Sequence, residues 1–201
     1  MAQDIVELLE KPLPRPKRDL VSYASARVLE ALLEALLALE FLARGYTRNA
    51  AGKVFQAWRA LTAALLALEK DKIANALGRE EEKKWLIEVA IPRAPSSRLK
   101  PLARLLEEVA ELPYYYPLTD KALSLHDYQY HGPDPSGELS KHPDREEAAH
   151  DILYLVAKLA DIVEERVKPR LREMGKWTRD HEESLQRLRE RLASWSRTSG
   201  E

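Results

Sequence analysis

The stretch from residue 119 to residue 131, TDKALSLHDYQYH, gathers side chains that can do chemistry. It contains two of the chain's five histidines, with tyrosine, aspartate and lysine close by. A histidine titrates near neutral pH and can act as a base, and a lysine can stabilise a developing negative charge. The stretch is therefore either a catalytic or binding site, or an aromatic seam at the end of a helix.

His126 is the candidate base of this stretch, and Lys121 is its candidate electrostatic partner. Positions five apart on a helix are separated by about 140° around its axis. The two side chains therefore converge on one phosphate only if the helix breaks or a second subunit takes part. The structural alternative is that His126 bonds a backbone carbonyl or an aspartate at a helix end.

Three neighbours of His126 are candidate binding residues, namely Asp127, Tyr130 and His131. A second candidate group is a basic stripe earlier in the chain, made of Arg93, Arg98, Lys100 and Arg104. The stripe is equally consistent with a solvated face. The tyrosines can pack and hydrogen-bond, or offer a stacking platform for bases: Tyr114, Tyr115, Tyr116, Tyr128 and Tyr130.

A metal site is a further alternative, because imidazole and carboxylate are ligands for Zn and other divalent ions. Its ligands would be His126, Asp127, His131 and His142. Their spacing matches no standard ligand motif, and we predict neither a bound metal nor another cofactor. The chain also lacks a Gly-rich phosphate loop, a serine nucleophile elbow and a His-Glu-x-x-His pair, so none of those chemistries is predicted.

The composition is that of a globular protein, with 201 residues of which 45% are apolar and 32% charged. The formal net charge is −1, whereas a typical nucleic-acid-binding domain is strongly basic. A local basic patch is still possible in a chain with this balance of charges. Cysteine is absent, which excludes disulfides and thiolate chemistry. No signal peptide or membrane span is expected, which indicates a cytoplasmic protein without a membrane partner. The two Asn and four Gln beside many Arg and Glu are typical of a thermophile.

Leucine spacing and turn residues predict the elements that must position these side chains. Helices are expected over 3–10, 19–44, 47–68, 79–91, 96–112, a short segment from 119, a long segment from 144, and 176–195. Thr47, Thr119-Asp120 and Asp144 are the expected helix starts. Trp85 is expected to point inward, and Pro169 to kink or end its helix.

No segment shows the alternation of a strand, so the fold class is all-α. The simplest arrangement is an up-and-down antiparallel bundle of about five principal helices with helical extensions at both ends. Three regions are expected: a short helix and Pro-rich connector at 1–18, the bundle at 19–170, and a charged helix or tail at 171–201.

Four segments carry a resemblance to a known family: the hairpin at 39–68, RAPSSRLKPLARLLEE at 93–108, ALSLHDYQYHGPDPSGE at 122–138, and DREEAAHDILYLV at 144–156. They resemble the archaeal PaREP-type family and, more distantly, the HEPN superfamily of helical bundles. The HEPN resemblance implies a homodimer, and many HEPN domains are metal-independent ribonucleases. Their motif is an Arg, four to six residues, then a His, completed across two subunits.

Two segments can be compared with that motif. Lys121 to His126 has the position that suits the family and is followed by Tyr128, but lysine replaces the arginine. Lysine lacks the planar fork with which arginine binds phosphate. Arg145 to His150 matches the letters, but two glutamates lie between them, and a chance match is expected in a chain with this many arginines.

The sequence therefore predicts a homodimeric, non-catalytic interaction or binding module. The very apolar helix at 19–44, which one bundle face would not fully cover, also favours a dimer. A metal-independent ribonuclease using His126, Lys121 and Tyr128, with RNA as partner, is the first alternative. A metal-binding protein using the cluster from His126 to His142 is the second.

Overall fold

A computed structural model describes the backbone of residues 2–198 and the side chains of residues 5–195. All regular elements among these residues are helical, which confirms the predicted all-α bundle. The chain folds around one long antiparallel hairpin, formed by α2 (Leu20–Ala43) and α3 (Thr47–Leu68). Gly45 turns the chain between them with a φ of 77°, a left-handed conformation that glycine adopts without steric cost.

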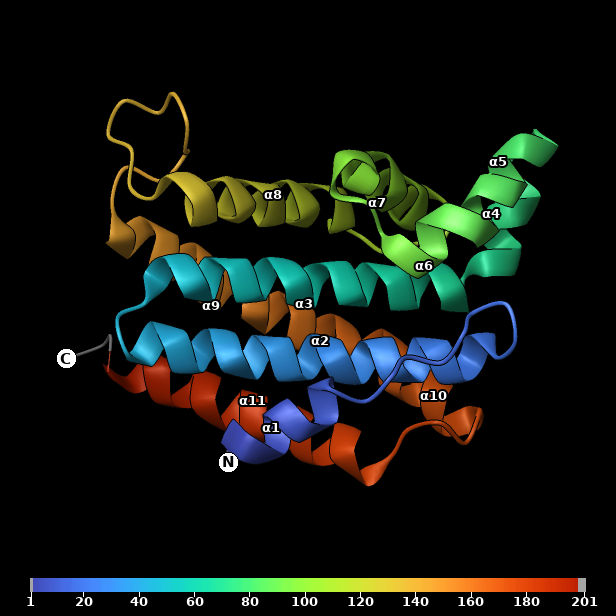
Figure 1. The fold of residues 1–201 in the computed structure, drawn as a ribbon, viewed down its shortest axis with the longest axis horizontal. Helices are drawn as coiled ribbons and strands as arrows, with labels where there is room; N and C mark the ends of the chain where they lie inside the picture. Colours follow the sequence, from blue (N-terminus) through green and yellow to red (C-terminus); the bar gives the residue numbers. More distant parts are fainter. Residues whose placement is uncertain (1, 199–201) are drawn as a thin grey trace.

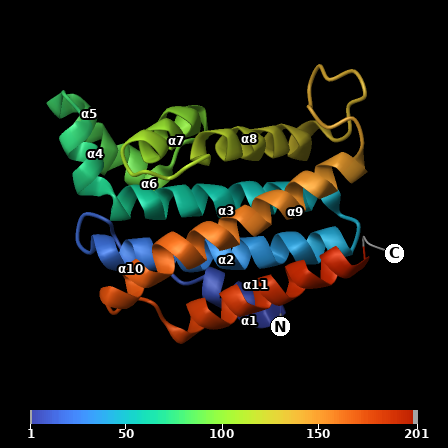
Figure 2. The same cartoon turned by 180° about the vertical axis from the view of Figure 1, so that it is seen from behind.

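The helix α3 lies at the centre of the bundle and packs against α2, α7 (Leu99–Glu108), α8 (Tyr115–His131) and α9 (Arg145–Ile162). In Figure 1, α7 and α8 lie above α3, while α2 lies below it. Figure 2 shows α9 crossing the opposite side of the hairpin. The core is rich in alanine and leucine, and the largest fully buried side chain is Trp58 of α3.

The face of α2 that looks away from α3 is covered by the terminal helices. The helix α11 (Arg179–Thr198) packs along α2, and α1 (Ala2–Leu9) also contacts it. No large apolar side chain of α2 is exposed. The expectation that the helix at 19–44 keeps an uncovered apolar strip is therefore wrong, and that strip no longer argues for a dimer.

Between the hairpin and α7, the chain forms several short helical pieces. They are α4 (Lys70–Ala76), which the sequence did not predict, α5 (Glu80–Trp85), the π-helical turn η1 (Leu86–Ala90), α6 (Ile91–Arg93) and the 3₁₀ turn η2 (Ser96–Arg98). The prediction that Trp85 points inward is wrong, because 36% of it is exposed while its neighbour Leu86 is buried. The helix expected over 96–112 ends at Glu108, and Glu111 then takes a left-handed φ of 55°.

The predicted start of α3 at Thr47 is confirmed, but Thr47 is not its cap, because it is the first helical residue and Tyr46 before it provides no side-chain cap. One predicted helix start is wrong. The helix α8 begins at Tyr115, several residues before the predicted cap at Thr119-Asp120. Pro117 lies in the first turn of α8, where its missing N–H costs no helical hydrogen bond.

The predicted start of α9 at Asp144 is confirmed, because the Asp144 side chain accepts a hydrogen bond from the backbone N–H of Glu147. After Ile162 the helix passes through the π-helical turn η3 (Val163–Val167) into α10 (Lys168–Glu173). Pro169 therefore does not end the helix, and the irregularity of the helix is the π turn directly before this proline. Both π turns end two residues before a proline, Pro92 and Pro169.

Candidate functional site

Buried hydrogen bonds hold the first half of α8 against the centre of α3. The indole Nε1 of Trp58 donates to the hydroxyl of Thr119 at 2.8 Å, and the hydroxyls of Thr62 and Tyr115 lie 2.8 Å apart. The rings of Trp58 and Tyr115 stack with centroids 4.9 Å apart. Burial raises the pKa of Tyr115 well above its ordinary value, so this hydroxyl stays neutral. These contacts determine which way every later residue of α8 faces.

His126 faces α3 and is stacked on an apolar ring. Its imidazole lies 3.9 Å from the ring of Phe55, centroid to centroid, at an interplanar angle of 18°. The ring of Tyr130 meets it edge-on at 5.1 Å, and Tyr130 itself is 62% exposed. The Nδ1 atom of His126 is buried and has no hydrogen-bond partner. His126 is thus an imidazole packed between two aromatic rings, rather than the hydrogen-bonded helix-end residue of the structural alternative.

Lys121 faces the other way and belongs to a polar network between α8 and α9. Its Nζ lies 2.5 Å from Oδ1 of Asp151, and Nε2 of His142 lies 3.1 Å from Oδ2 of the same carboxylate. We call Lys121, His142 and Asp151 the α8–α9 polar network. Burial would raise the pKa of Asp151, but the hydrogen bonds from His142 and Lys121 outweigh it and hold that pKa at about 2.

Tyr128 lies on the Lys121 side of α8. Seven residues make almost two full turns, so Lys121 and Tyr128 share one face while His126 points away from it. The ring of Tyr128 packs edge-on against His142 at 5.4 Å, and burial raises its pKa. Within one chain, the three candidate catalytic residues are therefore divided between two faces of α8.

The loop between α8 and α9 supplies His142 to the polar network. Asp134 organises this loop, because its carboxylate accepts hydrogen bonds from the backbone N–H groups of Ser136, Gly137, Leu139 and Ser140. The Ser136 hydroxyl donates as well, and together these bonds lower the pKa of Asp134. The backbone N–H of Asp134 in turn donates to the carbonyl of His142. These hydrogen bonds fix the conformation of the loop and thereby position the imidazole of His142.

A small polar cavity of about 240 Å³ opens beside the network. Its lining includes both cations and carboxylates, namely Asp120, Lys121, Lys141, Glu147 and Asp151, with Ser124, His142 and Pro117. Two of these charges are paired, Lys121 with Asp151 and Asp120 with Lys100, so the wall mixes both signs of charge. The Nδ1 atom of His142 is buried without a hydrogen-bond partner.

The predicted binding residues do not form one surface. Asp127, Tyr130 and His131 are exposed on the last turns of α8. Arg98 and Lys100 are exposed near the start of α7, and Lys100 forms an ion pair with Asp120 in the first half of α8. These two groups lie at different ends of α8.

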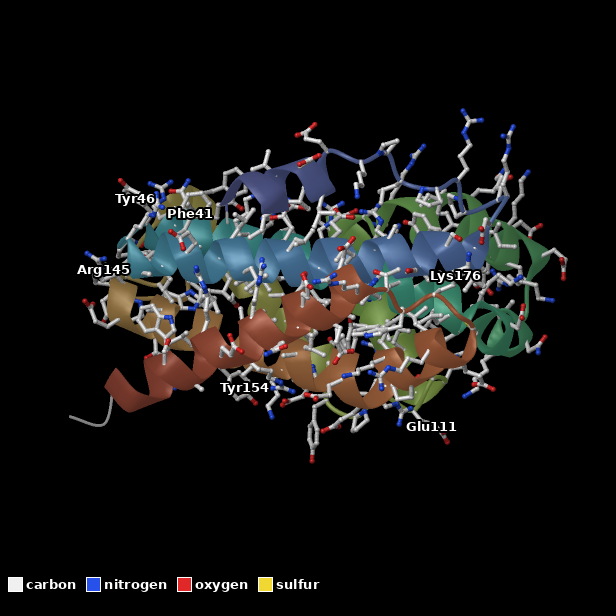
Figure 3. All side chains as sticks on the ribbon, turned by 90° about the horizontal axis from the view of Figure 1, so that it is seen from below. Phe41, Tyr46, Glu111, Arg145, Tyr154 and Lys176 are labelled. Atoms are coloured by element: carbon white, nitrogen blue, oxygen red, sulfur yellow. The ribbon has the colours of Figure 1, made fainter. Side chains whose placement is uncertain are left out.

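The arginine of the second motif comparison has a structural role. The Arg145 guanidinium donates to the carbonyl of Gly45 at 3.1 Å, which ties the start of α9 to the turn between α2 and α3. Arg48 caps the end of α8, donating to the carbonyls of Gln129 and Tyr130 at 2.9 and 2.5 Å. Figure 3 shows Arg145 and Tyr46 at the same end of the bundle. His150 is 75% exposed, and its Nδ1 lies 3.7 Å from Asp151.

The four side chains of the metal alternative are not brought together. His126 faces α3, His142 is buried beside Asp151, and Asp127 and His131 are exposed. Across the part of the chain that the structure describes, no three His, Asp or Glu side chains gather as a metal site would require. The reason is geometric, because these residues come from different faces of α8 and from a loop beyond it. No helix within residues 2–198 is both long and apolar enough to cross a membrane.

Sequence reasoning missed Asp151 and Phe55. Asp151 had a usable signal, since it stands on the apolar stripe of α9 between Ala148 and Leu155, all of which are buried. A carboxylate at such a position requires a buried cationic or hydrogen-bonding partner. Phe55 had no comparable signal, because an aromatic residue on a buried face is ordinary core.

The fold and the polar network together define an all-helical bundle built on a central antiparallel hairpin, with its chemistry-bearing side chains on α8, on α9 and on the loop between them. The sequence model of the archaeal PaREP1/PaREP8 family matches residues 26–153. The chain belongs to this family, as the four segments of the resemblance predicted. No curated protein and no solved structure matches the chain.

Proposed function

We propose that the chain is a homodimeric, non-catalytic interaction module of the cytoplasm. One observation carries the proposal: Lys121 and His126 are engaged with different helices on different faces of α8. Lys121 is bonded to Asp151 of α9, while His126 is stacked on Phe55 of α3. Cleavage of RNA needs a base and a cation at one phosphate, and Lys121 and His126 of one chain do not reach one phosphate from the same side.

The charge state of the polar network supports the same proposal. With its pKa held at about 2, Asp151 is ionised at neutral pH and neutralises the Lys121 ammonium. A phosphate approaching Lys121 would therefore meet a carboxylate with which it must compete. The arrangement suits a rigid polar joint between two helices better than a site for a developing negative charge.

The dimer part of the proposal rests on the resemblance to HEPN domains, which implies a pair of subunits. Because α1 and α11 cover α2, the dimer surface does not consist of an uncovered apolar strip of α2. Sedimentation equilibrium of the full chain tests this directly. A measured mass of one chain at every concentration would overturn the dimer. The non-catalytic assignment would not be affected by that result, because the cleavage assay below tests it separately.

A cleavage assay tests the non-catalytic assignment. Purified protein is incubated with a labelled RNA of mixed sequence in the presence of EDTA, beside the His126→Ala variant. We expect neither protein to cleave the RNA. Cleavage by the wild type that persists in EDTA and disappears in His126→Ala would overturn the assignment.

Such a result would favour the alternative, a metal-independent ribonuclease with His126 as base. One observation speaks for that alternative: the ring of Tyr130, which is exposed and lies 5.1 Å from the His126 ring, could stack on an RNA base. The cation would then come from the second subunit or from Arg59, whose guanidinium lies 5.9 Å from the centroid of the Phe55 ring. A Lys121→Ala variant separates the two cases, because loss of cleavage with the fold intact would assign Lys121 that role.

A further inference from the structure

An apolar groove opens between the short helix α5 and the helix α7, outside the polar network. Its volume is about 440 Å³. The apolar part of its lining consists of Leu77, Trp85, Leu86, Leu102 and Leu105. Trp85 is a large aromatic side chain that is 36% exposed, so it is not needed to fill the core. We call this feature the α5–α7 groove.

Two carboxylates, Glu81 and Glu82, stand at the edge of the α5–α7 groove. Both are exposed, and neither forms an ion pair with any side chain that the structure describes. Their neighbour Glu80 differs, because it is bonded to Lys83. Acidic residues are favoured in the first turn of any helix, but that preference does not explain an exposed tryptophan beside them. The groove therefore combines an aromatic wall, an apolar floor and an unpaired acidic rim.

The chain itself contains a segment of complementary chemistry. Residues 11–18, KPLPRPKR, which we call the connector, hold three prolines and four cations. Leu13 is 41% exposed, and Lys11 and Arg15 are exposed without an ion pair among the described side chains. Lys17 already donates to Glu88, which follows α5 in the same chain, at 3.0 Å. The connector thus shows, within one chain, that it can pair with an acidic residue of this region.

We propose that the α5–α7 groove binds the connector of a second copy of this chain. This inference rests on the proposed homodimer and names its contact surface. Extended Pro-rich segments bind aromatic-lined grooves because their conformation is largely set before binding, which lowers the entropy cost. Leu13 and the prolines would pack on Trp85, and Arg15 and Lys11 would pair with Glu81 and Glu82.

The positions of the two surfaces fit a closed dimer. Figure 1 shows the connector running along α2 from the middle of the bundle to the end where the α4–α5 arm lies, opposite the turn between α2 and α3, and Figure 2 shows the same end from behind. A two-fold axis at this end would let each connector meet the groove of the other subunit. Such an isologous interface contains every contact twice and leaves no open surface for further growth.

Sedimentation equilibrium of four full-length proteins tests the inference. They are the wild type, Glu81→Gln/Glu82→Gln, Arg15→Glu, and a matched control, Glu138→Gln/Glu146→Gln, which removes two exposed carboxylates near the opposite end of the bundle. We expect the dimer dissociation constant to rise about ten-fold or more in both groove and connector variants, since symmetry doubles each lost ion pair. The control variant should dimerise as the wild type does.

A synthetic peptide of residues 11–18 provides the second arm of the test. We expect it to dissociate the dimer and to change the fluorescence of Trp85, with no such change in Trp85→Phe, which identifies the signal among four tryptophans. A dimer of equal strength in all four proteins would overturn this inference while leaving the homodimer proposal standing. A chain that is monomeric and does not bind the peptide would overturn both.

Discussion

Asp151 is the residue that decides what the candidate site is. Its two carboxylate oxygens are divided between a lysine of α8 and a histidine of the preceding loop, so three segments of the chain meet at one side chain. A buried carboxylate with two donors is stable in its ionised form and costly to leave with one donor missing. Its effect on stability is therefore the most direct test of the polar network.

We predict that Asp151→Asn destabilises the protein by about 2 kcal/mol at pH 7, the equivalent of its lowered pKa. The pKa of Asp151 is about 2 in the folded chain, against an ordinary value of 3.8. Because the folded state binds the proton less readily, the stabilisation is fully present above about pH 4 and is lost as the pH falls towards 2. Urea unfolding of both proteins at pH 7 and pH 3 measures the difference.

The matched control is Asp127→Asn, which removes an exposed carboxylate from the neighbouring helix α8. Its free energy of unfolding should differ little from that of the wild type at either pH. An equal loss of stability in the two variants, or a loss in Asp151→Asn that does not shrink in acid, would contradict the assigned role of the network.

Gly52 and Gln129 form a second pair that single residues can test. A Cβ atom added at Gly52 would lie 2.6 Å from Cδ of Gln129, so the glutamine must move when the glycine is replaced. We predict that Gly52→Ala stabilises a Gln129→Ala background by about 0.5–1 kcal/mol, since alanine favours a helix interior over glycine. In the wild type the gain should be smaller, because the end of the glutamine side chain must first move aside. Thermal unfolding of the double-mutant cycle measures this difference, and equal effects in both backgrounds would refute the contact.

At the scale of elements, the start of α9 depends on one cap. The side chain of Asp144 accepts from the N–H of Glu147 at 2.8 Å. We predict that Asp144→Ala lowers stability by about 1 kcal/mol and the melting temperature by about 2–4 °C. Asp144→Asn keeps the acceptor and should melt close to the wild type. Thermal melts followed by circular dichroism measure both variants. An equal loss of stability in Asp144→Ala and Asp144→Asn would show that the charge of Asp144, rather than its cap hydrogen bond, is responsible.

The prolines act on two elements in a way that sequence rules describe only partly. A proline inside a helix lacks the N–H that would bond the previous turn. Here the chain widens into a π turn just before Pro92 and again before Pro169. The helix ends at Arg93, directly after Pro92, whereas it continues past Pro169 to Glu173, so a proline alone does not determine where a helix ends.

At the scale of the whole molecule, the C-terminal helix takes part in the common core. Leu185 and Leu188 of α11 are buried, and the His181 ring bonds the carbonyl of Ser25 in α2 at 2.8 Å. Burial lowers the pKa of His181, which favours its neutral form. The sequence analysis predicted a separate charged helix or tail at 171–201, and these contacts connect that segment to the core of the bundle. The division of the chain at residue 171 stays a prediction.

We predict that Leu188→Ala costs about 2–5 kcal/mol of global stability, because it opens a cavity in the shared core. Arg187→Ala, on the exposed side of the same helix, serves as the matched control. Calorimetry should show one lowered transition for Leu188→Ala and little change for the control. An unchanged main transition would indicate that residues 171–201 are an independent appendage.

The sequence alone determined the helical class, the central hairpin, the start of α9 and the family. These follow from local signals: leucine spacing, a glycine after a helix, an aspartate before one, and four matching segments. It also indicated correctly that Lys121 and His126 point to different sides of one helix, because that angle is a property of the helix itself.

Only the tertiary structure decided what each of those side chains meets. Lys121 is bonded to Asp151, which is 30 residues further along the chain, and His126 stacks on Phe55 of α3. The start of α8 was likewise decided by its contacts with Trp58 and Thr62, since the bonds to Thr119 and Tyr115 hold that turn in helical form. Periodicity and capping describe neighbours along the chain, whereas a pairing between distant helices depends on how they pack, and one sequence carries no local signal for it.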